Sequence, residues 1–119
     1  NCKFEKVILK NQINNFETFT KNQIQRRDID KLIIESKMPD VLIVKNLSEF
    51  FNKIDLEVKI SNKDIFLIQA FDKDRNYSES AVYTRKTGEL IHEITTNIKQ
   101  DEKEKDISFY SCEKIKNKI

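Results

Sequence analysis

Residues 72–78 place oxygen-bearing side chains at every second position, the spacing that a calcium-binding loop uses. These side chains are Asp72, Asp74, Asn76 and Ser78. Such a loop also needs a glycine for its sharp turn and a bidentate glutamate further on. This chain has Tyr77 and Tyr83 at those two positions. We therefore interpret the segment as a polar loop between two strands and expect no metal site.

The chain has a single histidine, which excludes a multi-histidine metal site. His92 shares one face of a predicted strand with Leu90 and Ile94, so we expect it to be a partly buried polar group, or the polar group of a ligand pocket. A nucleophilic pair of His92 with Cys112 would require their two strands to be neighbours. That pair would be lost if Cys112 forms a disulfide.

Two further motifs have the letters of a catalytic signature without its order. Residues 111–114 match S-x-x-K and residues 86–88 match K-T-G, which penicillin-binding enzymes combine. In those enzymes the serine motif comes first and opens a helix, whereas here it comes last and lies in a predicted strand. The only glycine, Gly88, also excludes a glycine-rich phosphate loop. We find no catalytic constellation, and we expect a protein that is not an enzyme and needs no cofactor.

The 119 residues suffice for a single domain spanning 1–119. Charged residues make up 35% of the chain, but 22 basic and 20 acidic side chains nearly cancel to +2. Nucleic-acid binding needs a one-sided basic surface, so we exclude it. We interpret the doublet Arg26-Arg27 as part of a solvated helix face, because Asp28 and Asp30 follow it. No apolar run approaches the roughly 18 residues of a membrane span.

The two cysteines, Cys2 and Cys112, allow three interpretations. They form a disulfide between the two ends of the chain, or they are free thiols in a reducing compartment, or Cys2 is the acylated residue of a lipoprotein. The first and third imply export. We therefore favour an exported or cell-envelope location, such as the periplasm, over the cytoplasm.

Apolar residues recur at helical spacing from Ile13 to Ile33, which predicts one or two amphipathic helices over 13–37. A short helix is expected over 47–53, with Asn46 as its N-cap. Alternating or apolar runs predict further strands, with Gly88 in a hairpin turn. These runs are 41–44, 54–60, 65–71, 80–85, 89–96 and 107–115; we expect 65–71 to be covered on both faces and 99–106 to be a solvated loop. The fold class is therefore α+β, with N-terminal helices packed on one face of an antiparallel meander of four to five strands. This order of elements resembles the cystatin-like and nuclear-transport-factor-like folds.

The predicted fold leaves a sheet edge or face exposed for recognition. We therefore expect a non-catalytic protein-binding domain, for instance an inhibitor or a toxin-neutralising, immunity-type protein of a bacterium. The contact residues we expect are Asp72, Asp74, Arg75, Tyr77 and Tyr83. One alternative is a small-molecule carrier with His92 in its pocket, and another is a structural envelope lipoprotein. A homo-oligomer formed through a sheet edge is also compatible with the pattern.

Overall fold

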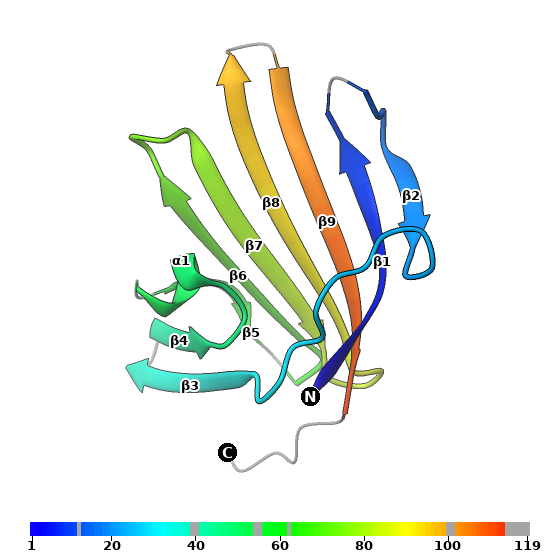
Figure 1. Cartoon of the computed structure of the whole chain (residues 1–119). Helices are drawn as coiled ribbons and strands as arrows, with labels where there is room; N and C mark the ends of the chain where they lie inside the picture. The colour runs from blue at the N-terminus through cyan, green and yellow to red at the C-terminus, as the bar shows by residue number, and fades with distance from the viewer. Residues whose placement is uncertain (12, 39–40, 54–55, 62, 100–101, 114–119) are drawn as a thin grey trace.

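The chain is nearly all β-structure in the computed structural model, which describes residues 1–11, 13–38, 41–53, 56–61, 63–99 and 102–113. The elements are β1 (Cys2–Lys10), β2 (Glu17–Thr20), β3 (Ile33–Met38), β4 (Val41–Lys45), α1 (Glu49–Asn52), β5 (Leu56–Ser61), β6 (Ile65–Asp72), β7 (Tyr77–Thr84), β8 (Glu89–Lys99) and β9 (Glu102–Cys112) (Figure 1). The four residues of α1 are the only helix in the described part of the chain.

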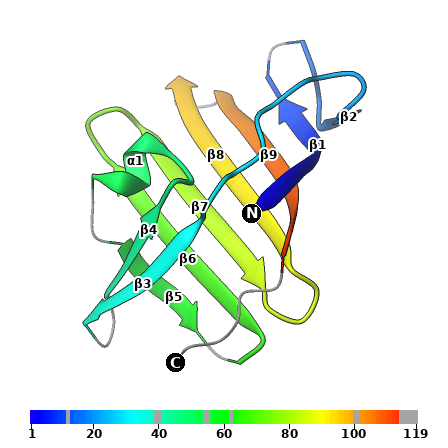
Figure 2. The same ribbon diagram turned by 60° about the horizontal axis from the view of Figure 1, so that its bottom comes forward.

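The strands form one antiparallel sheet in the order β2-β1-β9-β8-β7-β6-β5-β4-β3. Strands β5 to β9 follow one another as a meander, and the N-terminal hairpin β1–β2 adds to β9. The sheet curls at its other end, so that the hairpin of β3 and β4 lies across the inner face together with α1 (Figure 2). The segment between β2 and β3 crosses the same face. We call this covered side of the sheet the concave face.

The core lies on the concave face, because alternate residues of each strand point there. On β7 these are Glu79, Ala81 and Tyr83, all buried. The register continues the pattern, since Tyr83 pairs with Leu90 and Leu90 pairs with Tyr110. The buried hydrophobic residues come from β1, β4, α1, β6, β7, β8, β9 and the crossing segment: Cys2, Phe4, Val7, Ile29, Val44, Phe51, Ile68, Ala70, Ala81, Tyr83, Leu90, Tyr110 and Cys112.

The predicted helices over 13–37 are wrong. Ile13 and Phe16 would belong to the buried helix face, yet 88% and 51% of their surfaces are exposed. Phe16 and Lys31 have positive φ angles of 53° and 54°, which a right-handed helix does not allow. The apolar spacing instead comes from an irregular segment in which Ile24, Ile29 and Leu32 pack against the sheet. The expected α+β class and the resemblance to cystatin-like and nuclear-transport-factor-like folds fall with these helices.

Three local predictions need smaller corrections. Ser48, not Asn46, caps α1, because its Oγ accepts from the backbone N–H of Phe51 at 3.2 Å. The charged segment expected as a loop over 99–106 is strand from Glu102 onward, with positions 100–101 outside the described residues. Strand β6 is not covered on both faces, since Phe71 is 60% exposed on the outer one. The charged segment from Glu102 can still form a strand, because a strand with one buried face tolerates charged side chains on its other face.

The antiparallel arrangement of the strands is confirmed, but the described residues form nine strands instead of the expected four to five. The turn at Gly88 is confirmed as well. Its φ of +76° lies in the left-handed region that glycine adopts at little cost. A Cβ at this position would also come within 2.4 Å of the Cys112 carbonyl oxygen. The Cys112 amide donates to the Gly88 carbonyl at 2.8 Å, so the turn lies directly against the end of β9.

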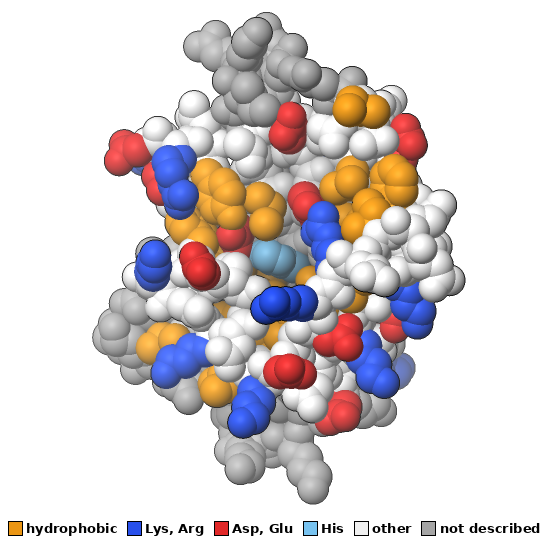
Figure 3. Space-filling view, viewed as in Figure 1, with side chains coloured by type: hydrophobic (Ala, Val, Ile, Leu, Met, Phe, Trp, Pro, Cys, Tyr) orange, Lys and Arg blue, Asp and Glu red, His pale blue; other side chains and the backbone are white. Residues whose placement is uncertain are grey.

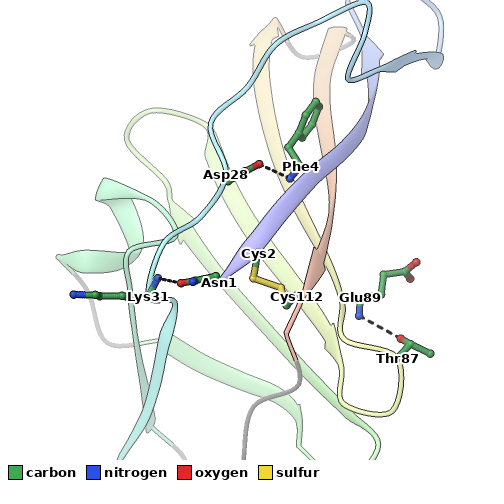
Figure 4. The surroundings of a disulfide bond; sticks show 8 residues. All are labelled: Asn1, Cys2, Phe4, Asp28, Lys31, Thr87, Glu89 and Cys112. Carbon is green, nitrogen blue, oxygen red and sulfur yellow. Dashed lines mark hydrogen bonds between the residues drawn. A yellow bond between two sulfur atoms is a disulfide. The ribbon is translucent and has the colours of Figure 1, made fainter.

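A disulfide joins Cys2 at the start of β1 to Cys112 at the end of β9 (Figure 4). The two residues are direct cross-strand partners with Cα atoms 3.9 Å apart. The backbone of Cys2 exchanges its hydrogen bonds with Ile29 instead of Cys112, at 2.7 and 2.8 Å. The cysteines therefore form a non-hydrogen-bonded pair, the kind whose side chains lie closest. With both sulfurs bonded to each other, the free-thiol and acylated-Cys2 interpretations do not describe this structure.

We expect the double variant Cys2→Ala/Cys112→Ala to lose about 4–5 kcal/mol of unfolding free energy, because the link closes a loop with a sequence separation of 110 residues. Urea unfolding with and without reductant measures it. Reductant should destabilise the wild type and leave the double variant unchanged. A loss below about 1 kcal/mol would contradict a stabilising role.

Candidate functional site

The centre of the concave face holds a buried carboxylate that accepts three hydrogen bonds. Only 2% of Glu79 on β7 is exposed. Its Oε2 accepts from the Ser48 hydroxyl at 2.8 Å and lies 2.8 Å from His92 Nε2. Its Oε1 accepts from the hydroxyl of Tyr77. We call Ser48, Tyr77, Glu79 and His92 the Glu79 network.

Strand register and the start of α1 position this network. Tyr77 and Glu79 are two residues apart on β7 and so point to the same face. His92 is the cross-strand partner of Ala81, which lies two residues from Glu79 and therefore on the same face of the sheet. Ser48 donates to Glu79 while it accepts from the first turn of α1, so the carboxylate ties the helix to the sheet.

Electrostatics favour the charged form of Glu79. Burial of the carboxyl raises its pKa, but the hydrogen bonds from His92, Tyr77 and Ser48 outweigh burial and leave the pKa below the ordinary 4.5. The pKa of Tyr77 is raised, first by burial and then by its hydrogen bond to Glu79. At neutral pH the pair is therefore a carboxylate and a phenol donor, and a charged carboxylate can remain buried because its oxygens are satisfied.

A second polar cluster lies beside the network on β9. Arg26, from the crossing segment, donates from both terminal nitrogens to the Asp106 carboxylate at 2.7 Å each. It also donates to Ser108 Oγ at 2.8 Å, and Ser108 is the cross-strand partner of His92. The hydrogen bond to Asp106 is the main reason that the pKa of Arg26 is raised. Arg26 thus anchors the crossing segment to the sheet, and our interpretation of it as a solvated helix residue is wrong.

The turn between β6 and β7 carries an exposed arginine held against two aromatic rings. The Arg75 guanidinium lies 5.1 Å from the Tyr77 ring centroid and 5.8 Å from that of Phe50 on α1. The two rings meet edge to face at 5.1 Å. Arg75 Nε donates to Asp72 Oδ2 at 2.7 Å, and 62% of the Arg75 side chain is exposed. We call Phe50, Asp72, Arg75 and Tyr77 the Arg75 patch.

The patch and the network share one side of the molecule. In the space-filling view the single histidine lies in a central hollow, with hydrophobic side chains gathered on both sides of it (Figure 3). Tyr77 links the two groups, because its ring packs in the patch and its hydroxyl binds Glu79.

The structure brings together three of the five expected contact residues, Asp72, Arg75 and Tyr77. The backbone N–H of Asp74 donates to Asp72 at 3.1 Å, and the Asp74 side chain is exposed beside the patch. Tyr83 lies apart and is 3% exposed. Hydrogen bonds within the turn, first of all from Arg75, lower the pKa of the Asp72 carboxyl. Asp72 is therefore engaged in an ordinary Asx-type turn, as a polar loop predicts.

His92 is buried, as its pattern predicted, but its partner is Glu79. Cys112 cannot act as its nucleophile because the sulfur is in the disulfide. No group of three or more potential metal ligands occurs among the residues described. Ser48, Glu79, Phe50 and Asp106 were not among the predicted site residues, and Arg26 was assigned to a solvated helix face. Glu79 had a usable signal, since it is an acid at an alternating position shared with Tyr77, Ala81 and Tyr83.

No family model, curated protein or solved structure matches this chain. Within the described ranges, no helix is long and apolar enough to cross a membrane.

The Glu79 network predicts a specific pH dependence of stability. Because the folded pKa of Glu79 lies below its ordinary 4.5, its contribution is complete above that pH and is lost as the pH falls through the folded pKa. We expect Glu79→Gln to cost about 1–3 kcal/mol at pH 7, and the difference from wild type to shrink below about pH 4.5. Urea unfolding at pH 7, 5, 4 and 3 measures it.

Glu93→Gln is the matched control, because this half-buried carboxylate on β8 pairs with Lys105 at 3.1 Å on the other face. Its effect should stay below about 1 kcal/mol, because ion pairs near the surface contribute little to stability. A cost for Glu79→Gln that is the same at pH 7 and pH 3 would contradict an ionised Glu79.

Proposed function

We propose that the chain is a non-catalytic protein-binding domain that contacts its partner through the Arg75 patch. The observation that carries the proposal is the exposed guanidinium of Arg75, held by Asp72 and stacked on Phe50 and Tyr77. Arginine and aromatic residues are the types enriched where protein interfaces concentrate their binding energy.

The patch is organised before any partner arrives. Asp72 engages only Nε of the guanidinium, and the terminal nitrogens make no hydrogen bond with the described residues. Their N–H groups are free to donate to a carboxylate or carbonyl of a partner. The Glu79 network supports this arrangement because Glu79 accepts a hydrogen bond from the Tyr77 hydroxyl and so holds the Tyr77 side chain in place. A side chain that is already ordered loses less conformational entropy on binding.

The disulfide supports an oxidising compartment as the place of action. Cys2 and Cys112 are bonded to each other, and such links persist in exported proteins and are rare in reducing cytosol. We therefore propose an exported or envelope-located partner as well.

Affinity capture from an extract of the source cells, followed by titration of the recovered protein, tests the proposal. We expect Arg75→Ala to weaken binding by about 30-fold, since truncating a central arginine costs about 2 kcal/mol or more. Tyr77→Ala should weaken binding in the same way.

Arg85→Ala is the matched control. Arg85 also stacks on an aromatic ring, that of Phe66 at 3.8 Å, but it lies at the opposite end of β7, after Thr84. Its removal should leave the affinity unchanged. An Arg75→Ala variant that binds as tightly as wild type would refute the placement of the interface.

A further inference from the structure

Two short sequences in the chain have the form Asn-x-Ser without proline in the middle, which is the acceptor motif for N-linked glycosylation. One spans 46–48, just before α1, and the other spans 76–78, where the β6–β7 turn enters β7. Transfer of a sugar requires an accessible asparagine amide and a serine hydroxyl that the transferring enzyme can reach. The surroundings of the two motifs therefore decide which of them can be modified.

The motif at 46–48 is engaged in the fold. The side-chain nitrogen of Asn46, which would carry the sugar, donates to the backbone carbonyl of Lys31 at 2.8 Å. The Ser48 hydroxyl donates to Glu79 at 2.8 Å and accepts from the backbone N–H of Phe51 at 3.2 Å. An enzyme that reads both side chains would have to detach Ser48 from the Glu79 network, so we expect this motif to stay unmodified.

The motif at 76–78 presents the same two groups without partners. Asn76 is exposed in the β6–β7 turn (Figure 1), and its side-chain amide makes no hydrogen bond in the part of the chain that the structure describes. Ser78 points to the outer face of the sheet, because its neighbours Tyr77 and Glu79 point to the concave face. Ser78 is partly exposed, and its hydroxyl likewise has no hydrogen bond among the described residues. Both acceptor groups are therefore open to an enzyme.

Backbone geometry explains Asn76 but not Ser78. The φ angle of Asn76 is +48°, a left-handed conformation that asparagine adopts more readily than most residues. No contact in the described chain requires a hydroxyl at position 78. Asp74 also places an acid two positions before the asparagine, which the bacterial enzymes that transfer such sugars require in addition. The disulfide between the chain ends is typical of exported proteins, the class in which this motif is used.

We propose that Asn76 is a site of N-linked glycosylation and that Asn46 is not. The Asn76 amide nitrogen attacks the first sugar carbon of an oligosaccharide that is linked to a lipid pyrophosphate. The new C–N bond replaces the C–O bond to the pyrophosphate, the nitrogen loses one proton, and the lipid pyrophosphate leaves with the bonding electrons. The chain supplies only the acceptor, and the enzyme and the lipid-linked oligosaccharide come from the cell that exports it.

A sugar on Asn76 would also affect the Arg75 patch. Asn76 lies between Arg75 and Tyr77 in the chain, so the oligosaccharide would stand beside the patch and hinder the approach of a partner. This consequence rests on the proposed function, whereas the modification itself does not.

Mass spectrometry of tryptic peptides from the chain, purified from its source cells, tests the proposal. Trypsin cleaves after lysine and arginine, so the two motifs fall in separate peptides, 46–53 and 76–85. We expect peptide 76–85 to carry the added mass of an oligosaccharide on Asn76, and peptide 46–53 to have its unmodified mass. Ser78→Ala, expressed in the same cells, should lose the added mass completely, and it should fold because it removes only an unengaged hydroxyl.

Ser78→Thr and Asn46→Gln are the matched controls. Threonine keeps the hydroxyl of the acceptor motif, and Asn46 lies outside the proposed site, so both variants should keep the added mass on 76–85. Three results would overturn the proposal: a wild-type peptide 76–85 without sugar, a sugar on peptide 46–53, or a Ser78→Ala chain that still carries the sugar. None of these measurements involves a partner, so this proposal and the Arg75 patch fail separately.

Discussion

The buried carboxylate of Glu79 is the constraint on which the concave face depends. Only 2% of Glu79 is exposed, and a buried charge is tolerable only when its oxygens are hydrogen-bonded. This requirement positions three side chains at once. Ser48 brings the start of α1 to the sheet, Tyr77 is held where it contacts Arg75, and His92 Nε2 lies 2.8 Å from the carboxylate. The helix has only four residues. It is too short to be stable alone, so its position follows from this contact and from the packing of Phe51.

The elements that cover the concave face are attached to it in different ways. Some are held by polar contacts and a disulfide, and others by apolar packing. Arg26 fixes the crossing segment to β9 by a bidentate ion pair, and the disulfide fixes the start of β1 beside it. The β3–β4 hairpin, by contrast, packs on the sheet through apolar side chains, among them Ile34, Val44, Phe66 and Ile68. The polar contacts therefore hold the part of this face that carries the proposed Arg75 contact surface.

Local chemistry in the sequence predicted most of the strand residues from 56 onward, the left-handed turn at Gly88 and the burial of His92, but it placed the starts of β7 and β9 in loops. The prediction of helices over 13–37 failed because apolar residues at three-to-five spacing occur both in helices and in irregular segments that pack across a sheet. Local chemistry also failed for the candidate site, since Arg26 and Asp106 are 80 residues apart in the chain. The crossing segment bridges to β1 at Cys2 and Ile29, and β1 pairs with β9. No local pattern in the sequence predicts such a long-range contact. The β6–β7 turn was the exception in geometry alone, because Asp72, Arg75 and Tyr77 are close in sequence and contact one another.

The most direct test of the account is a side-chain ¹³C NMR titration of the Glu79 carboxyl, with the Phe51 amide followed in the same samples. We predict a carboxyl midpoint below the ordinary 4.5, with the Phe51 amide shifting at the same pH because Ser48 joins α1 to the carboxylate. A midpoint at or above 4.5 would show that the buried group is held as a neutral acid. That result, or a Phe51 amide that does not respond, would contradict the claim that an ionised Glu79 organises this face.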